Sequence, residues 1–167
     1  MKVVMLLGRS SGGIAGHVAE IGADLRQQGV DVLVVTDPLT AQRFDLQQVR
    51  PWWPGSGGWF RTLRDFGRLR RLAATSDVVH AHGLRAGALG VFAVRSLRRE
   101  MHPRVVVSLH NLPVGGRSVR AISAALERVV ARGSDVVLGV SGDLVDRARD
   151  GAGSCAFADP ANDRTGS

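Results

Sequence analysis

The chain has 167 residues, a length that suits one domain with a sizeable core. Hydrophobic residues make up 44% of it, but no apolar run approaches the roughly 20 residues that a membrane-spanning helix needs, which excludes such a helix within this sequence. Lysine and arginine total 22 against 15 acidic residues, and the net charge of +7 favours anionic partners such as a nucleotide or a membrane surface.

Cysteine content and the N-terminal sequence bear on the compartment. Cys155 is the only cysteine, so the chain can form no internal disulfide and no thiolate metal cluster. The apolar stretch Val3–Leu7 is too short for the core of a signal peptide. We therefore expect a cytoplasmic protein, and the residue pattern predicts neither a metal site nor a cofactor.

The first part of the chain predicts a βαβ unit. Lys2–Leu7 is a continuous apolar run, which is typical of a strand buried on both faces in a parallel sheet. Ile14–Gln28 repeats apolar residues at helical spacing and ends at Gly29. Val30–Thr36 is a second buried strand, closed by Asp37 and a proline. The crossover between the two strands should be right-handed.

A glycine-rich turn, Gly8–His17, joins the first strand to the first helix. Backbone N–H groups at the positive end of a helix attract a phosphate or another anion. Glycines suit such a turn because a Cβ would block close approach and because some turn positions need a positive φ. Ile14 and Ala15 replace the Lys and Ser/Thr of a Walker A loop, and Ser10 replaces the second glycine of G-x-G-x-x-G. A tight turn without a ligand is the alternative.

The middle of the chain is less regular. Residues 39–58 predict a short strand at Gln48–Arg50 and then a loop rich in proline and glycine. Trp59–Ala74 predicts a helix with a basic face. Its apolar side chains expected to point inward are Phe60, Leu63, Phe66, Leu69 and Leu72.

The start of this helix suggests a membrane contact. Aromatic side chains suit a membrane interface and arginines attract anionic headgroups. The residues that would make the contact are Trp59, Phe60, Arg61, Arg64 and Arg68. A core helix with a solvated basic face is the competing interpretation.

Strands and helices continue to alternate after this helix. The predicted strands are Asp77–Ala81, Arg104–Leu109 and Asp135–Val140, and the predicted helices are Leu84–Leu97, Ser118–Arg132 and Ser141–Asp150. The helix at 84–97 is rich in Ala and Gly, which suits close packing on a sheet. In the helix at 118–132 the residues expected to point inward are Val119, Ile122, Leu126, Val129 and Val130.

This alternation predicts an α/β fold: a Rossmann-like, doubly wound, mostly parallel sheet of about six strands with helices on both faces. Residues 1–150 form the predicted domain, and residues 151–167 are expected to be an irregular, disordered tail.

Ligands of such sheets bind beyond the carboxyl ends of the strands. His82 and His110 each follow a predicted strand and could hydrogen-bond a phosphate or sugar, or take a proton. His80 lies within its strand and is expected to be a core residue, while His102 is expected to be solvated. His17 should face either the loop or solvent.

Four segments resemble the N-terminal domain of glycosyltransferase family 4. They are Gly-Gly-Ile-Ala-Gly-His-Val-Ala-Glu at 12–20, Asp-Val-Val-His-Ala-His-Gly at 77–83, Ser-Leu-His-Asn at 108–111 and Gly-Val-Ser at 139–141. Enzymes of that family have the GT-B fold, retain anomeric configuration, use nucleotide-sugars and need no catalytic metal. The resemblance covers residues 1–150.

The resemblance implies roles for particular residues. Gly12 and Gly13 would lie at the interdomain cleft near the donor diphosphate, and His82 would contact the transferring sugar as the catalytic residue. His17, His110, Asn111 and Ser141 would line the substrate site. The partners implied are a nucleotide-sugar donor and a hydroxyl acceptor, which is a small molecule or lipid-linked.

GT-B enzymes carry most donor contacts on a second domain, and this sequence holds only the first. We therefore expect the chain to transfer sugar weakly or not at all alone, with a separate polypeptide as one source of the missing domain. The alternative is a non-catalytic Rossmann-like module that binds a nucleotide, a glycolipid headgroup or a protein. A nicotinamide-dependent oxidoreductase is disfavoured by Ser10.

Overall fold

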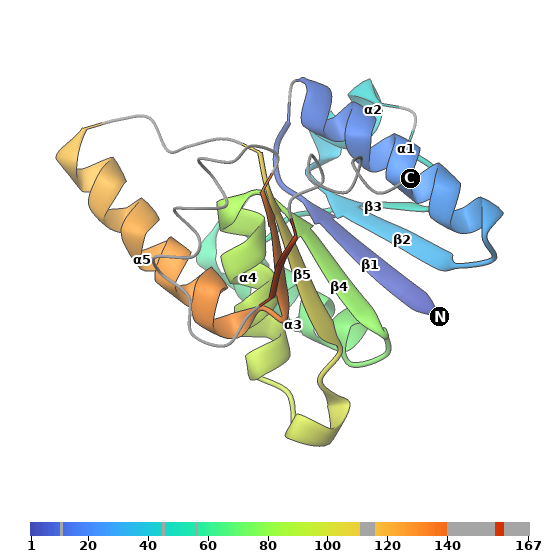
Figure 1. Cartoon of the computed structure of the whole chain (residues 1–167). Coiled ribbons are helices and arrows are strands. Elements are labelled where there is room, and N and C mark those ends of the chain that lie inside the picture. The colour runs from blue at the N-terminus through green and yellow to red at the C-terminus, as the bar shows by residue number, and fades with distance from the viewer. Residues whose placement is uncertain (11, 45, 56, 111–115, 140–155, 159–167) are drawn as a thin grey trace, which may run out of the picture.

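A computed structural model describes residues 1–10, 12–44, 46–55, 57–110, 116–139 and 156–158. Its centre is a parallel sheet whose strands lie in the order β3-β2-β1-β4-β5-β6-β7 (Figure 1). The strands are β1 (Lys2–Leu7), β2 (Asp31–Thr36), β3 (Val49–Pro51), β4 (Val78–His82), β5 (Arg104–Leu109), β6 (Val136–Gly139) and β7 (Ala156–Ala158). The predicted α/β Rossmann-like fold is confirmed.

Helices cover both faces of this sheet (Figure 1). They are α1 (Gly13–Gln27), α2 (Pro38–Arg43), α3 (Trp59–Ala73), α4 (Leu84–Arg95) and α5 (Arg117–Gly133), with a 3₁₀ turn at Arg99–Met101. The strands are buried on both sides, so alternate residues enter two different cores. Met5 packs with α1, whereas Leu6 packs with α3 and α4.

The small residues of α4 let it lie close to the sheet, as its composition predicts. A Cβ at Gly87 would stand 2.7 Å from Cγ1 of Val107 on β5 and 3.1 Å from Cγ2 of Val130 on α5. A Cβ at Gly90 would meet Leu6 at 3.2 Å. This helix packs against the central strands of the sheet, on one of its two faces. Its N-terminus therefore lies next to the C-terminal ends of β4 and β5.

The orientation predicted for α3 is wrong for its first turns. Its buried residues are Asp65, Leu69 and Ala73, whereas Phe60 is 74% and Leu63 55% exposed. A helix turns about 100° per residue, so Phe60 and Leu69, nine positions apart, point to opposite faces. The buried carboxylate of Asp65 is surrounded by arginine side chains, 3.1 Å from Nη1 of Arg68.

The same expectation fails at the start of α5. Val119 is 41% and Ile122 61% exposed, while Ser123, Val130 and Ala131 are buried. The N-terminal half of α5 projects beyond the sheet, so its apolar residues there have no strand to cover them (Figure 1).

Two further predictions need correction. Residues 38–43, within the segment expected to be irregular, form α2, whose first residue Pro38 follows the N-cap Asp37. The tail was expected to be irregular throughout, but Ala156–Ala158 pairs with β6 as the parallel strand β7. The rest of 151–167 and the helix predicted at 141–150 lie outside the described residues.

Candidate functional site

The strand order determines where in the fold the candidate site lies. From β1 the chain proceeds to β2 and β3 on one side, and then returns to β4 on the other side of β1. Ligands of doubly wound sheets bind where the strand order reverses in this way. Leu7 of β1 is paired with His82 of β4, and His82 with Ser108 of β5. The loop after β1, His82 and the residues after β5 therefore share one edge.

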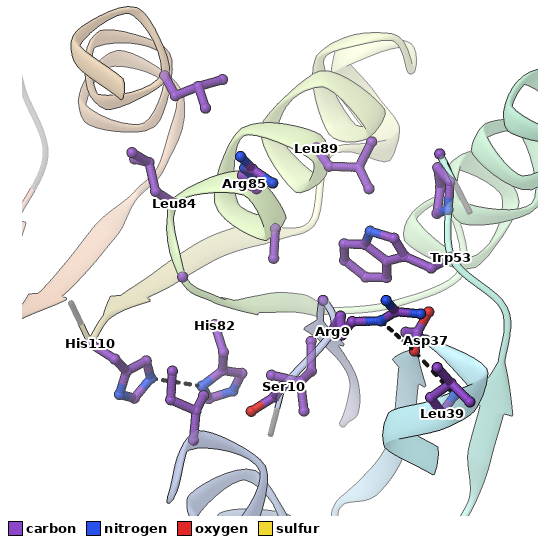
Figure 2. Close-up of a pocket in the computed structure, with 18 of the residues that line it drawn as sticks. Arg9, Ser10, Asp37, Leu39, Trp53, His82, Leu84, Arg85, Leu89 and His110 are labelled. Carbon is purple, nitrogen blue, oxygen red and sulfur yellow. Dashed lines mark hydrogen bonds and ion pairs between the residues drawn. The ribbon is translucent and has the colours of Figure 1, made fainter. Parts of the chain in front are cut away.

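An open cavity of about 1130 Å³ lies at this edge (Figure 2). Residues from several strand ends line it, among them Gly8, Ser10, Asp37, Trp53, His82 and His110. Ile14, in the first turn of α1, also lines it. The glycine-rich turn and His82 thus lie on the same side of the molecule, as a shared binding edge requires.

The loop between β1 and α1 is held by α2. The backbone N–H of Ser10 donates to Oγ1 of Thr40 at 3.0 Å, and that hydroxyl donates to the carbonyl of Ser10 at 3.3 Å. Nε of Arg9 lies 3.5 Å from Oδ1 of Asp37, which also accepts from the backbone N–H of Leu39 (Figure 2). Asp37 is therefore occupied in holding the loop and capping α2.

Of the two reasons predicted for the glycines of this loop, the positive φ is wrong, whereas open space for close approach is present. None of Gly8, Gly12 and Gly13 has a positive φ. A Cβ on Gly12 or Gly13 would meet nothing within 4 Å, so there is open space over the start of α1. Gly12, the N-cap of α1, provides no side-chain cap, so the positive helix end stays available to an anion. The lining glycines whose backbone conformation requires glycine are Gly55 and Gly83, each with φ of 89°.

Four histidines converge next to this loop: His17 on α1, His80 and His82 on β4, and His110 after β5. Nδ1 of His82 lies 3.4 Å from Nε2 of His110 (Figure 2). The ring centre of His17 is 5.6 Å from that of His110 and 6.5 Å from that of His82. The structure thus brings together His17, His82 and His110, which the sequence analysis singled out separately.

His80 and His102 are placed as expected. Nε2 of His80 lies 2.8 Å from Oγ of Ser108 on the neighbouring strand, so the ring has a polar partner inside the sheet. His102 is exposed, with Nε2 3.3 Å from the carbonyl oxygen of Leu97.

Burial favours the neutral form of His80, His82 and His110. It lowers the pKa of His80 from 6.5 to about 4 and that of His82 to about 2, with further lowering by the charges of neighbouring histidines. Burial and then the charge of His17 also lower the pKa of His110. At neutral pH such rings hydrogen-bond through one N–H and one bare nitrogen, and they are very weak bases.

His82 has an unused hydrogen-bonding atom. The residue is 3% exposed and lines the cavity, and its Nε2 has no hydrogen-bond partner within the described part of the chain. Buried polar atoms are nearly always paired, and an exception marks a place that a ligand or water can fill. This atom is the clearest sign of a polar ligand at the end of β4.

Some predicted site residues cannot be placed, and other residues were missed. Asn111 and Ser141 lie outside the described residues. Arg61 and Arg85 line the cavity but were not singled out as site residues. The position of Arg85, in the first helical turn after the strand-ending His82 and Gly83, was the signal available for it. Among the described residues no group of three or more His, Cys, Asp or Glu can hold a metal ion.

Comparison with known families defines the class of protein. The sequence matches the family described as Glycosyl transferase 4-like domain over residues 12–158. This match covers most of the chain, which therefore belongs to that family and confirms the predicted resemblance. A comparison with curated protein sequences finds no significant match.

Solved structures show the same fold. HepE from Anabaena, solved in complex with UDP and glucose, superposes with a TM-score of 0.71 at 16% identity, covering 95% of this chain and 43% of HepE. Sucrose-phosphate synthase from Thermosynechococcus elongatus gives 0.72 at 14% identity, covering 95% and 47%. MurG from Acinetobacter baumannii gives 0.58 at 17% identity, covering 86% and 42%. The chain spans less than half the length of these proteins.

Proposed function

We propose that this domain is the acceptor-side half of a nucleotide-sugar-dependent glycosyltransferase that transfers a sugar to an acceptor hydroxyl. Membership of the glycosyl transferase 4-like family and the shared fold support this class. The observation that carries the proposal is Nε2 of buried His82, which has no hydrogen-bond partner among the described residues and belongs to a side chain that lines the cavity where the strand order reverses.

The chemistry of His82 limits its role in this proposal. With its pKa lowered to about 2, the ring is too weak a base to remove a proton from an acceptor hydroxyl at neutral pH. A neutral imidazole with a free Nε2 can instead hydrogen-bond one hydroxyl of the transferring sugar and fix its orientation. Deprotonation of the acceptor would then fall to the donor phosphate, as the family resemblance implies.

The proposal also gives roles to the other predicted site residues. Gly12 and Gly13 offer the uncapped start of α1 to the donor diphosphate, and the open space above them suits close approach. His17 and His110 lie beside His82 and would line the acceptor side. For Asn111 and Ser141 a role in substrate binding remains a prediction.

The remaining donor contacts would come from a second domain outside the printed sequence, either in a longer chain or in a separate polypeptide. HepE and sucrose-phosphate synthase are each more than twice as long as the part that this chain matches. We therefore expect the 167-residue chain alone to transfer sugar weakly or not at all. Turnover near the enzyme median of about 10 s⁻¹ would refute this expectation.

A titration of the purified chain tests the proposed function. UDP-glucose, GDP-mannose and NAD would be added in turn while the imidazole NMR signals of His82 and His110 are followed. We expect a nucleotide-sugar, but not NAD, to shift both signals, and H82Q to weaken its binding several-fold. A response to NAD alone would refute the proposal. Nucleotide-sugar binding without sugar transfer, even with a donor-side domain added, would favour the non-catalytic binding module.

The exposed start of α3 supports a second partner, the anionic inner face of the membrane. None of the described helices is long and apolar enough to cross a bilayer. Trp59 and Phe60 are 65% and 74% exposed, and their rings lie 4.4 Å apart. Arg61, Arg64 and Arg68 each keep about half of their side-chain surface in solvent while pairing with Asp65. Exposed aromatic rings on the same helix as such cations suit a surface of anionic lipid headgroups.

Vesicle co-sedimentation tests this contact. Binding of the chain to vesicles containing anionic lipid should exceed binding to neutral vesicles, and F60S should weaken it several-fold. The matched control is F92S, because Phe92 is also exposed but lies on α4. Equal binding by the F60S and F92S variants, or no preference for anionic vesicles, would refute the contact.

A further inference from the structure

The cavity at the strand ends has two walls of different chemistry. The wall formed by the loop after β1 and by α2 is polar and includes Arg9, Ser10 and Asp37. The wall formed by α4 and α5 is apolar. Its apolar lining residues are Leu84, Leu89, Val119, Ile122 and Leu126, and the buried Ser123 of α5 also lines it.

The apolar wall is open to solvent. Ile122 is 61% and Val119 41% exposed, although both belong to the apolar positions of α5. Leu84, Leu89 and Leu126 are half-buried and pack against the core below. Contiguous exposed apolar surface beside a polar cleft indicates a surface that something else covers. Its continuity with the cavity favours a ligand that also reaches the polar edge.

A cationic corner adjoins this wall. Arg85, exposed in the first turn of α4, lines the cavity beside Leu84 and Leu89 (Figure 2). Within the described part of the chain its guanidinium has neither an ion pair nor a hydrogen bond. The N-cap of α4, Gly83, has no side-chain cap, so the helix presents its positive end here.

The same cavity holds a buried polar atom that has no partner among the described residues and that the proposed function assigns to a hydroxyl of the transferring sugar. Nε2 of His82, the residue before Gly83, is buried and unpaired among the described residues. The guanidinium of Arg85 and the positive end of the helix that carries it suit an oxygen-rich anion such as a phosphate, next to the sugar held by His82.

We propose that the acceptor of this site is a phosphate-bearing amphiphile, whose phosphate lies at Arg85 and whose hydrocarbon chain lies along the wall formed by α4 and α5. The inference rests on the proposed function, because it names the substrate class of that site. A neutral sugar would leave the guanidinium and the apolar wall unmatched. A phospholipid and an isoprenoid phosphate share the required chemistry.

Calorimetric titration of the purified 167-residue chain tests the proposal. Dodecyl phosphate, below the concentration at which it forms micelles, is compared with inorganic phosphate and with dodecyl maltoside. We expect dodecyl phosphate to bind at least about tenfold more tightly than either, because only it fills both the cationic corner and the apolar wall. Farnesyl phosphate in a parallel titration distinguishes an isoprenoid chain from a straight acyl-like one.

Two variants and their matched controls test whether dodecyl phosphate binds at Arg85 and the apolar wall. I122S and R85Q should each weaken dodecyl phosphate binding about five- to tenfold. F92S and R120Q should leave it unchanged, because Phe92 and Arg120 are exposed on the same two helices but do not line the cavity. F60S should also leave it unchanged, which separates the cavity from the start of α3. All five positions are exposed, and thermal unfolding checks that each variant folds.

Several results would overturn the proposal. Equal affinities for dodecyl phosphate and inorganic phosphate would show that the apolar wall does not bind the hydrocarbon chain. Equal losses of affinity in I122S and F92S would show that the amphiphile does not bind in this cavity. If I122S lowered the sedimentation coefficient from that of a dimer to that of a monomer without changing amphiphile binding, the apolar wall would be the contact surface for a second copy of the chain. A histidine response to nucleotide-sugar without amphiphile selectivity refutes this inference alone. Amphiphile binding without any nucleotide-sugar response refutes the proposed transferase instead.

Discussion

Acidification should destabilise this fold through the histidines of β4. Burial lowers the pKa of His80 from 6.5 to about 4 and that of His82 to about 2. In the unfolded chain both pKa values return to about 6.5. As the pH falls below about 6.5, the unfolded state therefore takes up protons that the folded state refuses, and the free energy of unfolding decreases.

The size of this effect follows from the same values. Between pH 7 and pH 5, each histidine with an unfolded pKa of about 6.5 and a folded pKa of 4 or less costs about 2 kcal/mol. His82 is almost fully buried and His80 only partly, so we expect about 3–4 kcal/mol for the pair. Since a domain has only about 5–15 kcal/mol of stability in total, the loss should be easy to detect.

Urea unfolding followed by circular dichroism at pH 7 and pH 5 measures the effect. The double variant H80Q/H82Q keeps only His110 of the three histidines with a lowered pKa, so it should lose clearly less stability, about 1 kcal/mol over this interval. H102Q, which changes an exposed histidine outside the cluster, is the matched control and should behave like the unsubstituted chain. A loss below about 1 kcal/mol in the unsubstituted chain, or an equal loss in the double variant, would refute the reasoning.

Two further predictions concern packing. G87A should destabilise the fold by about 1–3 kcal/mol, because its Cβ would stand 2.7 Å from buried Val107, whereas G67A, on α3 with nothing within 4 Å, should stabilise it by up to about 1 kcal/mol. Equal thermal shifts in the two variants would contradict close packing of α4. D65N should cost about 1–2 kcal/mol in urea unfolding, since a fully buried carboxylate that pairs with arginines would lose its charge. An unchanged midpoint for D65N would show that these ion pairs contribute nothing.

The alternation of strands and helices could be predicted because it depends on local patterns. Continuous apolar runs such as Lys2–Leu7 mark strands that are buried on both faces, and they do so without knowledge of their neighbours. The end of α1 at Gly29 and the tight packing of α4 also follow from single residues. Ala156–Ala158 was not predicted as a strand, because three residues are too few to show a pattern. These residues form a strand through their parallel pairing with β6.

The candidate site could be predicted only in part. His82 and His110 were expected at one edge because parallel strands end on the same side of a sheet. That two of their nitrogens lie 3.4 Å apart, and that Nε2 of His82 has no partner within the described residues, depends on β4 and β5 being neighbours in register. The pKa values likewise depend on burial, which the residue type does not reveal.

By itself the sequence determined the α/β alternation, the glycine-rich turn and the family, because these depend on the identity and spacing of residues near one another in the chain. Only the tertiary structure decided which apolar residues are covered. Ile122 fits the apolar pattern of α5, yet it faces the cavity because that half of the helix extends past the sheet. Arg85 acquires its place beside the apolar wall in the same way, since a binding site joins segments that the fold alone brings into contact.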